Sequence, residues 1–116
     1  MALYKVTKAE DAFQYFPAGH YDVRCTRLHT ADDLEGGKLT LGLSHFLPEG
    51  GAEMAEATLE MCYYIQKGEM TVTVGNDNTE YVLHAGDSIR FMPGTQRAPK
   101  NTGIHVAEML VMMLMK

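Results

Sequence analysis

The amino-acid sequence predicts an all-β protein, either a β-sandwich or a small antiparallel barrel. Short apolar segments recur roughly every 8 to 12 residues and are separated by turns rich in glycine, proline and asparagine. Residues 69–74 alternate cleanly, the turn 75–78 follows, and 79–83 returns the chain, which predicts a hairpin. At 116 residues the chain is long enough for one core, so we expect a single domain spanning 1–116.

The first 20 residues are predicted to form an N-terminal arm that contains one short helix. Thr7-Lys8-Ala9-Glu10 has the serine/threonine-x-x-glutamate form of a helix capping box. This indicates a helix from Lys8 to about Tyr15, which Pro17 and Gly19 would end.

Two predicted strands follow the arm, at 21–28 and 39–47, with a polar loop at 30–37 between them. In the first strand, Val23 and Cys25 should face one side and the charged residues the other. The second strand is interrupted only by Gly42 and is closed by Pro48-Glu49-Gly50-Gly51. Residues 52–58 have no clear period and fit either a loop or a frayed helical turn.

Two later segments are apolar on both faces. Residues 59–66 therefore read as a central strand, and 104–115 as a final strand with almost no polar alternation after Glu108. A strand that is apolar on both faces must be covered on both, by a second sheet or by a partner subunit. We therefore expect a homodimer.

Charge and composition limit the classes of partner and the compartment. The net charge of −5 argues against binding to nucleic acid or to an anionic membrane surface, because both attract basic patches. No apolar run approaches the ~20 residues of a membrane helix, and the first residues lack the core of a signal peptide. Cys25 and Cys62 fit a reduced protein better than a disulfide scaffold, so we expect a cytoplasmic location.

The segment 86–103 carries a family resemblance. Short extended pieces at 89–92 and 96–100 alternate with turns, and the fixed positions Gly86, Gly94 and Asn101 have the spacing of the second conserved motif of the cupin superfamily. The motif's proline is displaced by one, to Pro93, and its metal-binding histidine is replaced by Arg97. The resemblance covers about 39–115 and implies a cupin-type antiparallel β-barrel, or jelly roll.

Only the two ends of the first cupin motif have counterparts in this sequence: Pro48-Glu49-Gly50-Gly51 at its start and Gly68 at its end. Counting back from Gly68 places Met61 in the glutamate slot. The two histidine slots then fall on Ala55 and Ala57, on Met54 and Glu56 with the longer spacing, or on Glu56 and Thr58 when counted from Gly50. No register supplies a histidine, so the resemblance implies a small cupin that has lost its standard metal ligands. We expect no cofactor.

The residue types in these slots favour an organic ligand over a metal. Arginine has no lone pair for a metal, but its guanidinium recognises carboxylates bidentately. The resemblance puts Arg97 inside the barrel, as the polar anchor for an anionic or carbonyl-bearing molecule; otherwise Arg97 extends to solvent at the barrel mouth. Strand alternation places Tyr63 and Ile65 on the same face as Met61, and Met92 completes the predicted binding wall.

His45 and Tyr63 are the candidate catalytic residues, because each can exchange a proton inside a barrel. With either in place, isomerase, lyase or cyclase activity is open; without them, the site would bind or sense a small molecule. A second alternative is a metal enzyme in which Glu56, Glu60 and His45 are unusual ligands. The ordinary interpretation of the acidic residues near 53–60 is a solvated loop face.

Overall fold

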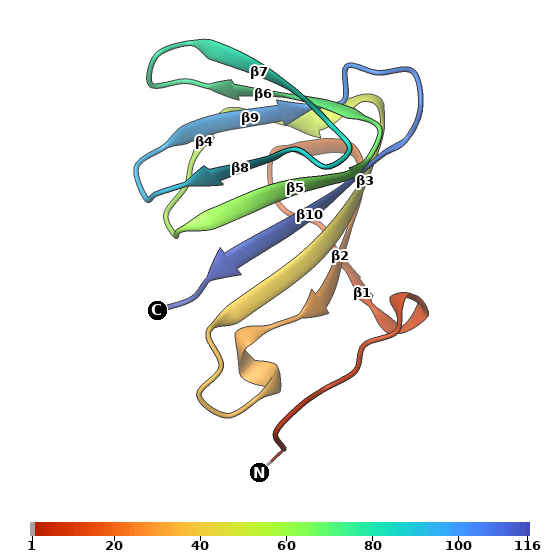
Figure 1. Ribbon diagram of the computed structural model, residues 1–116, viewed down its shortest axis with the longest axis vertical. Coiled ribbons are helices and arrows are strands. Elements are labelled where there is room, and N and C mark those ends of the chain that lie inside the picture. Colours follow the sequence, from red (N-terminus) through yellow and green to blue (C-terminus); the bar gives the residue numbers. More distant parts are fainter. Residues whose placement is uncertain (1) are drawn as a thin grey trace.

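The computed structural model describes residues 2–116 and confirms the predicted all-β architecture (Figure 1). Its strands are β1 (Phe13–Tyr15), β2 (His20–His29), β3 (Leu39–Ala52), β4 (Ala55–Glu56), β5 (Met61–Lys67), β6 (Glu69–Val74), β7 (Thr79–His84), β8 (Ser88–Phe91), β9 (Gln96–Lys100) and β10 (Ala107–Leu114). Every strand pair is antiparallel. The helical segments within residues 2–116 are three-residue 3-10 turns, and none is long or apolar enough to cross a membrane.

The strands form two facing layers joined by β3 (Figure 1). One layer has the order β1-β2-β3-β10-β5-β8, and the other has β7-β6-β9-β4. The 14 residues of β3 reach both layers, since its final turn pairs Gly51 with Lys100 of β9. The result is a nearly closed barrel whose inner faces enclose the core.

Register decides which side chains enter the barrel, because directly opposed residues of neighbouring strands share a face. Met109 of β10 lies between Ser44 of β3 and Ile65 of β5, and all three are buried. The core continues this alternation through Phe46, Ala57, Met61, Tyr63, Met70, Val72, Phe91 and Ala107. The predicted central strand at 59–66 is confirmed as β5, which runs between β10 and β8.

Asn101 fixes the corner where β3 passes from one layer to the other. Its side chain is fully buried, and Nδ2 donates to the carbonyls of Phe46 (3.0 Å) and His105 (2.8 Å). Its Oδ1 accepts from the Gly103 amide at 2.9 Å. The Asn101 backbone adds bonds to Glu49 and Gly50 at 2.9 and 2.8 Å. One residue therefore ties the bend in β3 to the end of β9 and to the segment that precedes β10.

The same corner excludes side chains at two glycines. A Cβ on Gly50 would lie 2.1 Å from the carbonyl oxygen of Asp22, and one on Gly51 would lie 2.3 Å from that of Pro99. Glu49 adopts a positive φ of 71°, which bends the strand. The sequence placed the end of this strand at 47; instead Pro48-Glu49-Gly50-Gly51 is a bend inside β3, and the strand continues to Ala52.

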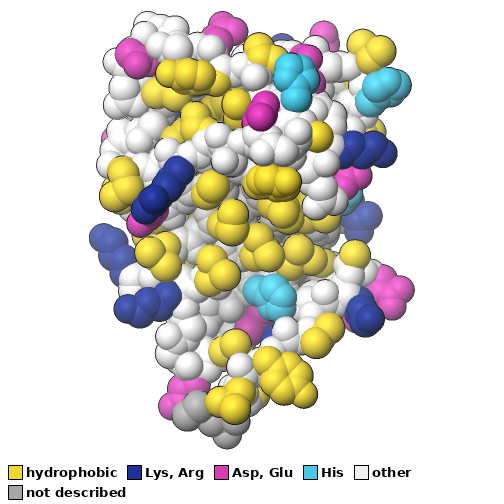
Figure 2. Space-filling model, viewed as in Figure 1, with side chains coloured by type: hydrophobic (Ala, Val, Ile, Leu, Met, Phe, Trp, Pro, Cys, Tyr) yellow, Lys and Arg dark blue, Asp and Glu magenta, His cyan; other side chains and the backbone are white. Residues whose placement is uncertain are grey.

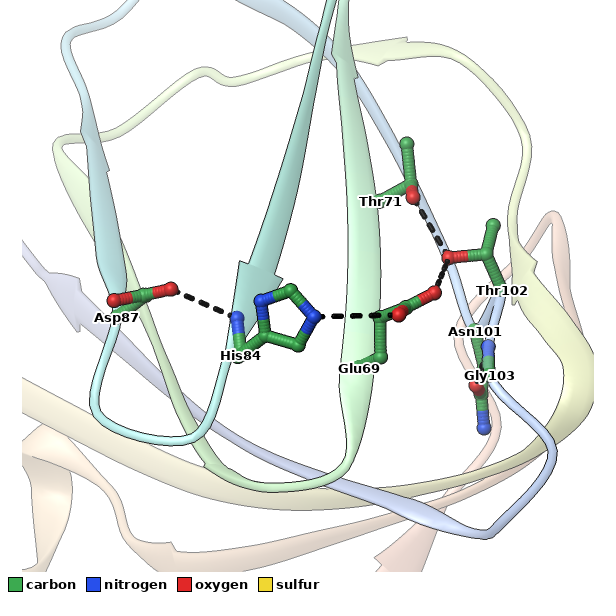
Figure 3. A network of polar contacts seen from close by, with 7 residues as sticks. All are labelled: Glu69, Thr71, His84, Asp87, Asn101, Thr102 and Gly103. Atoms are coloured by element: carbon green, nitrogen blue, oxygen red, sulfur yellow. Dashed lines mark hydrogen bonds and ion pairs between the residues drawn. The ribbon is translucent and has the colours of Figure 1, made fainter.

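A surface network holds the β6–β7 hairpin against the segment after β9 (Figure 3). Glu69 accepts from the Thr102 hydroxyl at 2.6 Å and lies 3.3 Å from His84 Nε2. Thr102 also shares a hydrogen bond of 2.7 Å with Thr71. Asp87 closes the next turn by accepting from the His84 amide at 2.9 Å. The hairpin predicted at 69–83 is thereby confirmed and anchored to the Asn101 corner.

The predicted helix from Lys8 to Tyr15 is wrong. Only Ala9–Asp11 makes a 3-10 turn, and Phe13–Tyr15 is strand β1, paired with β2. The Thr7 hydroxyl does not cap this turn, and it is buried without a hydrogen-bond partner among residues 2–116. Pairing with β2 supplies backbone hydrogen bonds that a short, poorly capped helix would have to make alone. A true capping box instead joins Thr30 and Asp33, within the segment predicted as a loop.

The outer face of the larger layer carries a continuous apolar surface, which we call the outer patch. It consists of Leu39, Leu41, Leu43, Cys62, Tyr64, Leu110, Met112 and Leu114. Leu110 lies between Leu43 and Tyr64 in adjacent strands, and Leu114 lies opposite Leu39, which is 51% exposed. Figure 2 shows apolar side chains gathered over the region where β5, β10 and β3 run in Figure 1. Interfaces of obligate dimers are apolar in this way.

We expect Asn101→Ala to lower the free energy of unfolding by about 2–4 kcal/mol, since it leaves buried backbone groups of three residues without partners. Urea denaturation measures the change. Asn101→Asp should also destabilise the protein, because it keeps the acceptor but loses both donors. Asn78→Gly is the control, since Asn78 lies in an exposed turn at φ 54°. A loss below about 0.5 kcal/mol in Asn101→Ala would contradict this role for the amide.

We also expect the outer patch to be covered by a second copy of the chain. Sedimentation at micromolar concentration should then give twice the monomer mass of 12.9 kDa. Leu110→Lys should dissociate the dimer, whereas Val82→Lys, at a 53% exposed position on β7, should leave it intact. A wild-type protein that sediments as a monomer would refute the prediction.

Candidate functional site

The barrel contains a cavity of about 200 Å³ between the two layers. Its wall combines apolar side chains with a small number of polar ones, the usual composition of a small-molecule site. The lining residues are Tyr15, Pro17, His20, Arg27, Ser44, Phe46, Met61, Tyr63, Arg97, Pro99, Met109, Val111 and Met113. None of these wall residues is acidic.

Arg97 enters the cavity from β9. It pairs with Val74 of β6 on one side and Ala55 of β4 on the other, so its side chain shares the inner face with Val74. Nη1 donates to the Ala55 carbonyl at 2.7 Å, which fixes the direction of the guanidinium. Nε is buried and has no hydrogen-bond partner within the described chain. Arg97 therefore retains donors for a ligand.

Tyr63 forms part of the opposite wall, on β5. It is 4% exposed, and its ring meets Phe91 edge-to-face with centroids 5.1 Å apart. Burial raises the pKa of the Tyr63 hydroxyl, and the positive charge of Arg97 and a side-chain hydrogen bond from Arg97 partly oppose the shift. At neutral pH the phenol is thus a protonated hydrogen-bond donor inside the cavity.

The N-terminal arm and β2 contribute a second polar group. The Arg27 guanidinium stacks over the ring of Tyr15, 4.1 Å from its centroid. Arg27 lies opposite Gly42 on β3, and a Cβ on Gly42 would lie 3.6 Å from the Tyr15 hydroxyl and 3.0 Å from the Thr26 carbonyl oxygen. The glycine that interrupts the sequence pattern of β3 thus leaves space beneath this pair.

His20 lies at the margin of the cavity, where β2 begins. Its Nδ1 is 3.1 Å from the Ala18 carbonyl, which can only accept, so Nδ1 carries the hydrogen. In the neutral ring, Nε2 then keeps its lone pair and can accept a proton.

The structure brings together three of the predicted site residues, Arg97, Met61 and Tyr63. Ile65 lies on the predicted inner face but is fully buried in the core and does not line the cavity. Met92 is 58% exposed in the β8–β9 turn, also away from the cavity wall.

His45 lies outside the cavity. It alternates on β3 with Ser44 and Phe46, which face inward, so its ring is on the outer side. There it lines a separate recess with Arg24 and Leu47. Strand alternation applied to His45, as it was to Met61, would have given this orientation.

The structure does not bring together Glu56, Glu60 and His45, the alternative metal ligands. Glu56 is in β4, Glu60 forms an ion pair with Arg90, and His45 faces outward. Within residues 2–116, no three His, Cys, Asp or Glu side chains gather closely enough to hold a metal ion.

The slots that correspond to ligands also do not fit a metal. Ala55 lies opposite Arg97, Ala57 is buried, and Met61 faces the cavity, which matches the register counted back from Gly68. Together they offer one thioether beside a fixed positive charge, and a divalent cation needs several lone-pair donors.

Several wall residues were missed by the sequence analysis because they lie before the resembling region. Tyr15 was assigned to a helix, and His20 was not among the predicted site residues. Arg27 could have been found, since it has the same strand parity as Val23 and Cys25. The sequence analysis assigned the charged residues of that strand to the other face.

Comparison with known proteins agrees with this architecture. Residues 43–113, more than half of the chain, match the family model described as the cupin domain. A protein of Mycobacterium tuberculosis named beta-D-galactosidase Rv1717 is 34% identical over 107 residues, which cover 92% of this chain and 90% of that protein.

Two solved structures show the same fold at lower identity. The polyketide cyclase RemF from Streptomyces resistomycificus has a TM-score of 0.82 and 14% identity, over 98% of this chain and 81% of that one. Drosophila melanogaster CENP-C bound to CAL1 has a TM-score of 0.75 and 22% identity, over 93% and 84%. These likenesses confirm the predicted jelly roll and concern the fold alone.

We expect the purified protein to hold no stoichiometric transition metal, because the ligand slots lack good donors. Elemental analysis after exhaustive dialysis measures this. Close to one zinc, iron, manganese or nickel ion per chain would contradict the expectation.

Proposed function

The chain belongs to the cupin domain family, and we propose that its barrel interior is a metal-independent binding site for a small organic molecule. The molecule carries an anionic or carbonyl oxygen that Arg97 binds. The single observation that carries this proposal is a guanidinium on the inner face with a buried Nε that has no partner among the described residues.

The remaining wall suits the body of such a ligand. Phe46, Met61, Met109 and Val111 present apolar surface, so the ligand loses water from its hydrocarbon part on binding. Arg97 is half-buried and its buried Nε has no partner among the described residues, so a ligand oxygen that accepts from it and carries negative charge offsets the cost of its partial desolvation. Charge-assisted bonds of this kind are among the strongest in proteins.

Proton transfer is available within the proposed site. Tyr63 is a protonated donor in the cavity, and Nε2 of a neutral His20 is an acceptor at its margin. An isomerase, lyase or cyclase step would use one to protonate and the other to deprotonate the bound molecule. If the protein is a binding or sensing module instead, it should show no turnover, and Tyr63→Phe and His20→Gln should change only its affinity for the ligand.

We place the protein in the cytoplasm, in keeping with two free cysteines.

A second candidate function is galactoside hydrolysis, which the name of the Mycobacterium tuberculosis relative favours. Most glycosidases use a pair of carboxylates, and the described cavity wall contains none. Hydrolysis of 4-nitrophenyl β-D-galactoside tests this candidate. Turnover that is lost in Tyr63→Phe would assign it to the barrel cavity.

The proposal predicts that anion binding depends on Arg97. Benzoate and its neutral analogue benzamide serve as probes, since they have similar shapes and differ in charge. Calorimetry should show tighter binding of benzoate, and Arg97→Ala should remove about 1.5–3 kcal/mol of its affinity. Arg97→Lys should restore only part, because an ammonium group lacks the bidentate geometry.

The melting temperature separates binding from folding in the same variants. Arg97→Ala should change it little, since the variant removes a poorly compensated charge. Arg90→Ala is the matched control, because that arginine pairs with Glu60 and is absent from the cavity wall. Equal affinities of wild type and Arg97→Ala for benzoate would overturn the proposal.

A further inference from the structure

The cavity holds a second arginine, Arg27, which enters from the other layer. Arg97 is on β9 of the smaller layer, whereas Arg27 is on β2 of the larger one, and both line the same space. Pairing places Arg27 opposite Gly42 and on the face of Cys25, which is buried. Two cations thus approach one cavity from facing sheets.

The two guanidinium groups are held in different ways. Arg97 is directed by its bond to the Ala55 carbonyl, and Arg27 by stacking on the Tyr15 ring. Stacking occupies the flat face of a guanidinium and leaves the N–H groups at its edge for hydrogen bonds. Because each guanidinium is fixed by its own neighbour, the two groups provide hydrogen-bond donors at two separate positions in the cavity.

Neither arginine has an acidic partner within residues 2–116. The ion pairs there join Lys5 to Asp33, His84 to Glu69 and Arg90 to Glu60. Tyr15 does not supply a counter-charge either, since burial raises the pKa of its hydroxyl and Arg27 only partly opposes this. Arg27 also borders an adjoining recess whose lining includes Asp32, but the two form no ion pair among the described residues.

We propose that the cavity binds a small molecule with two acidic groups, one held by Arg97 and the other by Arg27. This proposal rests on the function proposed above and narrows its ligand to the class of short dicarboxylates or their oxo derivatives. Val111, Met109 and Phe46 line the same cavity and would contact the carbon chain. In a chain of net charge −5, two cations in one cavity without a counter-ion favour a doubly charged ligand.

The probes are malonate, succinate, glutarate and adipate, each compared with the monocarboxylate of equal carbon number. Calorimetry at low ionic strength should find one dicarboxylate that binds at least about tenfold more tightly than its monocarboxylate. Arg27→Ala should lower the affinity for that dicarboxylate to the affinity for its monocarboxylate. The monocarboxylate, held by Arg97, should keep its affinity in the same variant.

Arg24→Ala is the matched control, because it removes the same charge from the same strand at a position on the outer side. Tyr15→Phe should retain the preference for the dicarboxylate, and Tyr15→Leu should weaken it, because only phenylalanine keeps a ring beneath Arg27. Circular dichroism establishes that each variant is folded.

The outcomes distinguish this inference from the function on which it rests. If monocarboxylates bind through Arg97 but no dicarboxylate binds more tightly than its monocarboxylate, the inference is overturned and the proposed function stays intact. Equal losses for monocarboxylate and dicarboxylate in Arg27→Ala would mean that both arginines hold one anion, and would also overturn it. Failure of every carboxylate to bind the wild type would overturn both.

Discussion

The buried amide of Asn101 is the interaction on which the rest of the barrel depends. A strand that leaves one sheet and joins another must give up regular pairing at the corner, and the backbone groups freed there need partners inside the protein. Asn101 supplies them for Phe46, His105 and Gly103, and its own backbone pairs with the bend at Glu49 and Gly50. The two layers can therefore face each other across a cavity.

The position of Arg97 follows from that corner. Asn101 terminates β9, and four residues earlier on the same strand Arg97 falls on the inner face opposite Ala55. Alternation along β9 then leaves Lys100 exposed to solvent and Pro99 in the cavity wall. A guanidinium in the interior is tolerated because one N–H group reaches a backbone carbonyl of the adjacent strand. The fold therefore places a fixed charge beside an apolar surface.

The sequence predicted the structure best where the residue types allow only one local conformation. Gly86, Gly94 and Asn101 carried the resemblance to the second cupin motif, and in the structure the two glycines adopt positive φ and Asn101 is fully buried. The strands between 59 and 100 were found to within two residues because turns with strong signals separate them. In the candidate site, strand alternation and the family resemblance gave Met61, Tyr63 and Arg97, all of which lie within residues 59–100.

The rest depended on contacts that no local pattern records. The segment before Tyr15 has the residues of a helix start, but pairing with β2 makes it a strand. A glycine pair usually ends a strand, whereas Gly50 and Gly51 allow β3 to pass close to Asp22 and Pro99. His45 lies between two wall residues in the sequence, yet strand alternation directs it to the outer side. Met92 follows the buried Phe91, and the turn after β8 directs it to solvent. The stacking of Arg27 on Tyr15 requires the pairing of β1 with β2, which no local pattern predicts.

The docking of the N-terminal arm on β2 is coupled to the affinity of the cavity for its ligand. β1 is held by three residue pairs on one side, so its opening costs far less free energy than unfolding of the barrel. Tyr15 and Pro17 are nevertheless parts of the cavity wall. By reciprocity, any occupant that contacts them must stabilise the docked arm as much as the docked arm tightens its binding. An occupied cavity would thus slow amide exchange in β1.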